Sequence, residues 1–204
     1  MKKYSILFLI VWAISSVTAV CHGQTTVPES KQAFVSIGYD WVEVDNADFD
    51  DVVAVEGGVL WPMQENLFVV TSITGINDSS TDTQEDNTGS YQLTLNSLEL
   101  LTGVQYQHHL SDLLSAYIRG GLLAYRMEIE LEEGFYGLKP SGRDSTSDTG
   151  WGLFVGAGVQ WDLQNQWLLK SELLYRNRFD FLDSSSTPFD VMSVGIHIGL
   201  ARHF

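Results

Sequence analysis

The chain ends in Met192-Ser-Val-Gly-Ile-His-Ile-Gly-Leu-Ala-Arg-His-Phe204, where apolar side chains alternate with small or polar ones. Successive side chains of a β-strand point to opposite faces. One face of this stretch therefore carries Met192, Val194, Ile196, Ile198, Leu200 and Phe204. The other face carries Ser193, Gly195, His197, Gly199 and Ala201. This pattern predicts a strand with lipid on one side and a narrow lumen on the other.

Similar patterns recur through the chain. Turn-forming and polar clusters separate eight strand-like runs, at 34–42, 52–61, 67–76, 90–107, 113–131, 151–162, 167–181 and 189–204. The connections between them alternate between short and long, as in membrane barrels with short periplasmic turns and longer outside loops. We therefore expect an all-β fold, an eight-stranded antiparallel up-and-down transmembrane β-barrel. Both termini would be periplasmic, and closure into a ring would leave no unpaired edge in the membrane.

Two regions interrupt this regularity. In the run 90–107 the apolar positions change parity near Asn96 and Ser97, from Leu95 and the residues before it to Leu98 and those after it, which predicts a β-bulge. Residues 77–89 hold no apolar side chain, and residues 132–148 contain three glycines and a proline. Both segments are expected to be long exposed loops.

The amino terminus has the features of a secretory signal. Lys2 and Lys3 precede an apolar run at 6–14, and small and polar residues follow it. We therefore predict a signal peptide at residues 1–23 and a single barrel domain at 24–204. No later segment reaches the roughly 18 uninterrupted apolar residues of a membrane helix. Cys21 could mark a lipid-anchored terminus, but cleavage near Gln24 would remove it, leaving no cysteine for a disulfide or a thiolate metal site.

The charge balance narrows the possible partners. The whole chain carries a net charge of −15, and loss of Lys2 and Lys3 with the signal makes it −15 − 2 = −17. Nucleic acid is therefore not an expected partner, because its phosphates would be repelled. Only 18% of the residues are charged, which suits strands with one lipid-facing side.

Two stretches carry a family resemblance. Gly156-Ala-Gly-Val-Gln-Trp-Asp-Leu-Gln-Asn-Gln-Trp-Leu-Leu-Lys-Ser-Glu-Leu-Leu-Tyr-Arg176 resembles the penultimate hairpin of OmpA-like outer-membrane β-barrel domains, and Tyr117-Ile-Arg-Gly-Gly-Leu-Leu-Ala-Tyr125 resembles their fifth strand. The resemblance implies an eight-stranded barrel in the bacterial outer membrane, in contact with its lipid and lipopolysaccharide. The final strand resembles the family's assembly signal, with Val194, Ile196, Ile198, Leu200 and Phe204 as its residues. It implies insertion by the outer-membrane assembly machinery.

The strand parity also sorts the aromatic and charged residues. An aromatic girdle at the two membrane interfaces would consist of Trp41, Trp61, Tyr106, Trp151, Trp161, Trp167 and Phe181. Charges on the lipid face are costly, whereas charges in the lumen can pair. The inward parity therefore predicts a lumen network of Glu56, Glu99, Arg119, Lys170, Glu172, Arg176, Arg178 and His197.

An eight-stranded barrel is just wide enough for its own side chains to fill it. We therefore expect this network to plug the lumen, in a protein with a structural or surface-interaction role. The alternative is a small gated pore lined by the same charges. A soluble lipocalin-like binder would be apolar inside and polar outside, the reverse of this pattern.

An outer-membrane lipid-modifying enzyme is the less favoured class. His109 and Ser111 form the one His-x-Ser pair, but they fall in a short periplasmic turn, away from outer-leaflet lipid. Ser193 and His197 share a face but lie about 13 Å apart along a strand. The acidic segment with Glu43, Asp45, Asp48, Asp50 and Asp51 could attract calcium or magnesium, but it lacks the spacing of a calcium loop. We therefore expect no cofactor, metal or catalytic residue, and no extracellular ligand can be named.

Overall fold

The computed structural model describes residues 30–44, 47–48, 52–77, 82–85, 89–135, 142–163, 165–181 and 189–204, so the expected signal peptide lies outside it. The described residues form ten β-strands. They are β1 Gln32–Val44, β2 Ala47–Asp48, β3 Val52–Gln64, β4 Leu67–Asn77, β5 Asp82–Glu85, β6 Gly89–His109, β7 Leu114–Phe135, β8 Gly142–Asp162, β9 Trp167–Phe181 and β10 Phe189–His203. None of these residues belongs to a helix long and apolar enough to span a bilayer.

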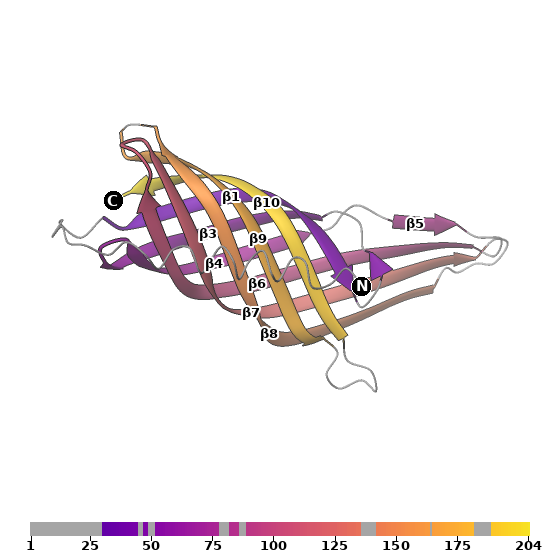
Figure 1. Cartoon of the computed structure of the whole chain (residues 1–204). Helices are drawn as coiled ribbons and strands as arrows, with labels where there is room; N and C mark the ends of the chain where they lie inside the picture. The colour runs from indigo at the N-terminus through magenta and orange to yellow at the C-terminus, as the bar shows by residue number, and fades with distance from the viewer. Residues whose placement is uncertain are drawn as a thin grey trace, which may run out of the picture.

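Eight of the strands close into an antiparallel ring (Figure 1). The ring runs β1, β3, β4, β6, β7, β8, β9, β10, and each strand pairs with its neighbour in this order. Pairing of β10 with β1, from Gln32↔His203 to Val44↔Val191, closes it. The short strands β2 and β5 pair with β1 and β6. The predicted eight-stranded antiparallel barrel is therefore confirmed.

The apolar face of the strands points outward. In β10, Ser193, His197 and Ala201 are buried inside the ring, whereas Ile196 and Ile198 are about half exposed, at 49% and 55%. The same alternation holds along β9, where inward residues are buried from Leu168 to Arg178. A water-soluble barrel could not tolerate so much outward apolar surface, but a lipid bilayer would cover it.

The connections differ in length at the two ends of the ring. At the end that also holds the carboxy terminus, the strands join through residues 65–66, 110–113 and 163–166. Asn66 and Asn165 adopt positive φ angles of 65° and 52°, a conformation that asparagine tolerates better than most residues. The predicted alternation of short and long connections is present. We refer below to this end as the short-turn end.

At the opposite end, β6, β7 and β8 continue beyond the other strands as a projecting sheet (Figure 1). β9 pairs with β8 only from Gly152 to Asp162, whereas β7 pairs with β8 as far as Gly142. The extra residues 142–151 span roughly 30 Å at about 3.3 Å per residue. The expectation of a long loop at 132–148 is therefore wrong for most of that segment. Backbone pairing continues there because strand ladders need no apolar side chain, so polarity alone does not end a strand.

The predicted bulge in β6 is also absent. β6 pairs without a register shift with β4 and with β7. Leu95 lies on the inner face and is 1% exposed, in an apolar cluster that includes Met127 and Val191. The change in apolar parity thus marks the point where the interior changes from apolar to charged. The side chains of Tyr91 and Leu93, the apolar residues that precede Leu95 in this alternation, lie outside the described residues.

Candidate functional site

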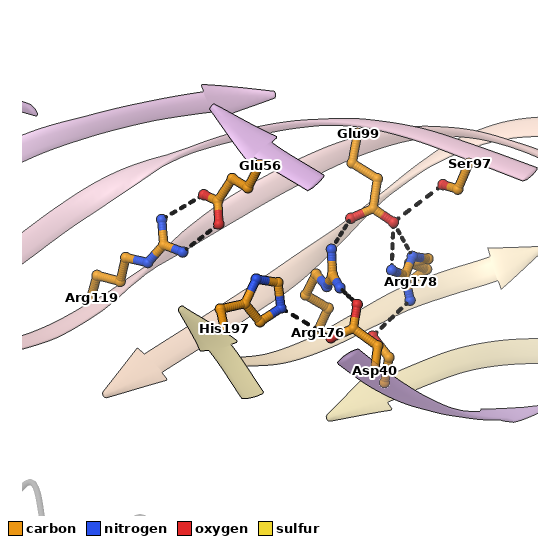
Figure 2. Close-up of polar contacts among 9 residues, drawn as sticks. Asp40, Glu56, Ser97, Glu99, Arg119, Arg176, Arg178 and His197 are labelled. Carbon is orange, nitrogen blue, oxygen red and sulfur yellow. Dashed lines mark hydrogen bonds and ion pairs between the residues drawn. The ribbon is translucent and has the colours of Figure 1, made fainter. Parts of the chain in front are cut away.

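The eight residues of the predicted lumen network are all buried inside the ring. Their contacts fall into two groups, and Figure 2 shows the Glu56–Arg119 pair of the first group beside the second group. We call one the Arg119 cluster, consisting of Glu56, Arg119, Lys170 and Glu172. We call the other the Arg176 cluster, consisting of Asp40, Glu99, Arg176 and Arg178, with His197 at its edge.

In the Arg119 cluster, one guanidinium holds two carboxylates. Arg119 Nη1 and Nη2 donate to the two carboxylate oxygens of Glu56 at 2.7 and 2.8 Å. Arg119 Nε donates to Glu172 Oε1 at 2.5 Å, and Tyr117 Oη donates to Glu172 Oε2 at 3.2 Å. This bidentate pairing uses the fixed fork geometry of arginine, the strongest form of charged hydrogen bonding.

Lys170 completes the Arg119 cluster through aromatic rings. Its Nζ lies 4.4 Å from the ring centroid of Phe34 and 4.7 Å from that of Tyr117. The guanidinium carbon of Arg119 lies 5.6 Å from the Phe34 ring. Cation–π attraction is worth more where water is excluded. The Phe34 ring is therefore in cation–π contact with both cations of the Arg119 cluster.

The Arg176 cluster is a chain of alternating charges. Arg176 Nη1 donates to Glu99 Oε2 at 3.1 Å, and its Nη2 donates to Asp40 Oδ2. Arg178 Nε donates to Glu99 Oε1 at 2.6 Å. Asp40 Oδ1 in turn accepts from His197 Nε2 at 3.0 Å. Each carboxylate is thus held by more than one donor, as a buried charge requires.

These contacts cross the lumen instead of following one wall. Arg119 on β7 reaches Glu56 on β3, and these strands lie three places apart in the ring. Arg176 on β9 likewise reaches Glu99 on β6, also three places away. Between the clusters and the barrel wall remains a void of about 10 Å³. A void of roughly 10–15 Å³ holds a single water molecule, so this space is not a channel.

Inward glycines make room for the charged side chains. A side chain at Gly195 would collide with the carboxylate of Asp40, and one at Gly156 would collide with that of Glu172. Gly195 pairs with Asp40 of β1, and Gly156 pairs with Arg119 of β7. Because these two glycines have no Cβ atom, the carboxylates of Asp40 and Glu172 can occupy the space beside them.

Comparison with known proteins agrees with this architecture. Residues 10–204 match the sequence model of the outer membrane protein beta-barrel domain family. The chain belongs to this family. No curated protein matches the chain.

Solved structures of other outer-membrane barrels share the fold. Ail, the attachment invasion locus protein of Yersinia pestis, is 13% identical with a TM-score of 0.54, over 87% of this chain and 100% of Ail. Neisserial surface protein A is 12% identical with a TM-score of 0.55, over 88% and 100% of the two chains. A major outer membrane protein of Thermus thermophilus has the same TM-score at 12% identity, over 85% and 99%. At such identity these likenesses concern the fold alone.

Asp40 is the network residue that the sequence-based prediction omitted. It is fully buried and joins Arg176 to His197. Its place on the inner face, with Ser36 and Gly38, could have been read from the alternation in the first strand. The alternation could not show that strand tilt brings it to the level of Arg176, which comes from β9.

The predicted girdle of this outer-membrane barrel contains one error. Its five tryptophans, Trp41, Trp61, Trp151, Trp161 and Trp167, are 42–58% exposed on the outer surface. Tyr106 is partly exposed. Phe181 is instead fully buried and packs against the rings of Tyr125 and Phe189.

A local irregularity explains the position of Phe181. Asp180 has a φ of 50°, and the pairing of β9 with β10 shifts register between Phe189 and Val191. An extra residue at such a point turns the following side chain to the opposite face. Phe181 therefore points inward, although Phe179 beside it contacts Trp151.

The residues predicted to form the assembly signal lie on the outer face of β10. Ile196, Ile198 and Leu200 are 43–55% exposed, Phe204 is 63% exposed, and Val194 is partly exposed. The backbone nitrogen of Phe204 donates to the carbonyl oxygen of Lys31 at 2.9 Å. The terminal residue thus extends the pairing between the first and last strands.

The residues weighed for catalysis have other partners. His109 Nδ1 lies 2.8 Å from Ser115 Oγ, whereas Ser111 Oγ accepts from the backbone nitrogen of Leu113 at 3.4 Å. Ser193 Oγ accepts from Arg178, and His197 bonds to Asp40. The described residues include no group of three or more histidine, cysteine or acidic side chains that could hold a metal. Asp45, Asp50 and Asp51 of the acidic segment lie outside those residues.

Proposed function

We propose that this chain is an integral, non-conducting barrel of the bacterial outer membrane with a structural or surface-interaction role. The observation that carries the proposal is the pair of ion-pair clusters that cross the lumen. Their arginines bind carboxylates from strands on the far side of the ring. A path for ions through the barrel would have to separate these pairs.

Separating the pairs is energetically unfavourable. Breaking a buried ion pair by removing one partner typically costs about 3–5 kcal/mol, because the remaining charge stays without compensation. The Arg119 cluster holds two carboxylates and two cations, and so does the Arg176 cluster. With every group ionised, each cluster is therefore neutral and attracts no particular ion.

Single-channel recording in planar lipid bilayers tests this proposal. The purified, refolded protein is expected to give no steady conductance, while its heat-modifiable migration on a denaturing gel shows that it has folded in the same lipid. Steady, voltage-independent conductance would overturn the plugged barrel and support the alternative, a small pore. Replacing Glu56, Arg119 and Glu172 together with alanine should still leave the Arg176 cluster closing the lumen.

We also propose that the termini and the short turns face the periplasm and that the projecting sheet faces the outside. Short periplasmic turns and longer outer loops are the usual arrangement in outer-membrane barrels. An epitope inserted within residues 136–141 should be labelled by antibody on intact cells. The same epitope inserted at 110–113 should be labelled only after the outer membrane is permeabilised. The reverse result would invert this orientation.

The proposed partners follow from the outer surface. Outward apolar side chains such as Ile198 and Leu173 would contact outer-membrane lipid and lipopolysaccharide. The outward face of β10, ending at Phe204, would be the signal for the assembly machinery. A catalytic role is not part of the proposal, because His197 and Ser193 are already engaged by Asp40 and Arg178. An altered lipid A mass on deletion of the protein would contradict that exclusion.

A further inference from the structure

Lysine and arginine side chains are unevenly placed on this acidic chain. Among the described residues, one set of them is buried in the two ion-pair clusters. Arg126 and Arg143 lie at the other end of the barrel, on the projecting sheet. The remaining two, Lys31 and Arg202, are exposed at the short-turn end. The described positive charge outside the lumen is therefore divided between the two ends of the barrel.

Strand pairing brings these two cations together on the outer face. Arg202 of β10 pairs with Ala33 of β1, and the backbone nitrogen of Phe204 donates to the carbonyl oxygen of Lys31 at 2.9 Å. Residues opposite each other in an antiparallel pair share one face, and their diagonal neighbours lie roughly 7–8 Å apart. Lys31 and Arg202 are such diagonal neighbours. Their long side chains can therefore reach one ligand between them.

Each of the two cations lies against an indole ring. Lys31 Nζ is 4.7 Å from the ring centroid of Trp61, and the guanidinium carbon of Arg202 is 5.5 Å from that of Trp167. Both tryptophans are 43% exposed on the outer surface, and tryptophan is enriched at the level of the lipid headgroups. A ring contact leaves the N–H donors of a cation for other acceptors, three in lysine and five in arginine. The ion pairs of the described residues involve other cations.

The acidic side chains at this end lie away from the two cations. Asp112 and Asp162 line a pocket together with inward-facing glutamines, and Glu65 belongs to the turn at 65–66. A terminal carboxylate on Phe204 would lower the charge of the two cations from +2 to +1 without reversing it. We call the outward residues here the basic patch, consisting of Lys31, Trp61, Trp167, Arg202 and Phe204.

We propose that the basic patch binds an anionic phospholipid, with Lys31 and Arg202 donating to its headgroup phosphate. Hydrogen bonds from lysine and arginine to phosphate are charge-assisted and strong. The acyl chains would lie on outward apolar side chains such as Val35 and Leu200, which pair across β1 and β10 and are 56% and 43% exposed. A zwitterionic headgroup fits less well, because its own cation would lie beside two others. The inference rests on the proposed membrane insertion, but not on the orientation or on a closed lumen.

Native mass spectrometry of the refolded, full-length barrel in a neutral detergent tests this site. The barrel is titrated with phosphatidylglycerol, with phosphatidylcholine of the same acyl chains, and with glycerol phosphate, which has no acyl chains. We expect phosphatidylglycerol to bind at least about fivefold more tightly than phosphatidylcholine, and glycerol phosphate not to bind. Lys31→Gln and Arg202→Gln should each weaken phosphatidylglycerol binding about fivefold, the effect of about 1 kcal/mol for each cation near an anionic lipid. Both variants should leave phosphatidylcholine binding unchanged.

Two matched variants separate the site from general effects of charge. Arg126→Gln removes an exposed cation on the projecting sheet and changes the net charge equally, whereas Lys31→Arg keeps the charge of the patch. Both should bind phosphatidylglycerol within about twofold of the parent. Equal affinity for the two lipids, equal weakening by Arg126→Gln, or equal binding of glycerol phosphate would each overturn the proposal. Heat-modifiability shows that each variant is folded, so a folded parent without lipid preference would overturn this inference and leave the proposed membrane barrel standing.

Discussion

Replacing Arg119 with methionine would test how far the lumen network stabilises the barrel. The substitution keeps much of the side-chain volume but removes the three hydrogen bonds to Glu56 and Glu172, at 2.7, 2.8 and 2.5 Å. Both carboxylates would remain buried, and the Arg119 cluster would change from neutral to a charge of −1. We expect the free energy of unfolding to fall by about 3–5 kcal/mol, as for other broken buried ion pairs.

A second substitution separates charge from packing. In Arg119→Met with Glu56→Gln, the cluster is neutral again, so the double variant should be more stable than Arg119→Met alone by about 1–3 kcal/mol. The control is Arg143→Met, which breaks an ion pair with Glu130 on the projecting sheet, where the Arg143 side chain is 69% exposed. An exposed pair is worth at most about 1 kcal/mol.

Urea unfolding in phospholipid vesicles, followed by tryptophan fluorescence, would give these free energies. The reasoning is refuted if Arg119→Met unfolds within about 0.5 kcal/mol of the parent, the range of an ordinary surface substitution. It is also refuted if the double variant is as unstable as the sum of the two single variants. In that case the loss would reflect packing and not the uncompensated charge.

Three further outcomes are expected from other parts of the barrel. Gly195→Ala should destabilise the barrel by about 1–3 kcal/mol in the same urea assay, because the new methyl group would collide with the carboxylate of Asp40. Gly75→Ala is the control and should change the stability little, because the space around Gly75 is open. Equal effects of the two variants would mean that the lumen is not tightly packed. Leu173→Arg on the lipid face should lower the free energy of unfolding by about 2–4 kcal/mol. Leu163→Arg at the short-turn end should lower it much less. Similar losses of stability in the two variants would argue against the assigned membrane position. Phe204→Ser should reduce the amount of folded barrel recovered from outer membranes without changing the stability of the refolded protein. An unchanged amount of this variant in a quantitative immunoblot would exclude a role of Phe204 in assembly.

Much of the barrel could be predicted from the sequence because each strand alternates in its own residues. The inner position of His197 between Ile196 and Ile198 is an example, and it needed no knowledge of other strands. The even strand number and the short turns were likewise local signals. Ring closure then followed from the requirement that backbone groups in lipid be paired.

The errors arose where a distant element decided the structure. Leu95 and Phe181 are apolar and inward, which contradicts a simple rule of apolar outside and polar inside, because they belong to the buried apolar cluster that also holds Met127 and Val191. The length of β7 and β8 depends on their pairing with each other. Most of the polar segment 132–148 therefore forms strand instead of a loop. Asp40 meets Arg176 only after the tilted strands have closed, a relation that no single strand can display.

Asp40 also has a consequence for the joint between the first and last strands. This joint pairs residues at opposite ends of the chain, such as Gly38 with His197, and it closes the ring. From β1, Asp40 bonds to His197 on β10 and reaches past that strand to Arg176 on β9. β1 and β10 are thus held together by side-chain contacts inside the lumen as well as by their backbone hydrogen bonds. Once formed, the barrel should therefore resist sideways opening between β1 and β10 toward the lipid.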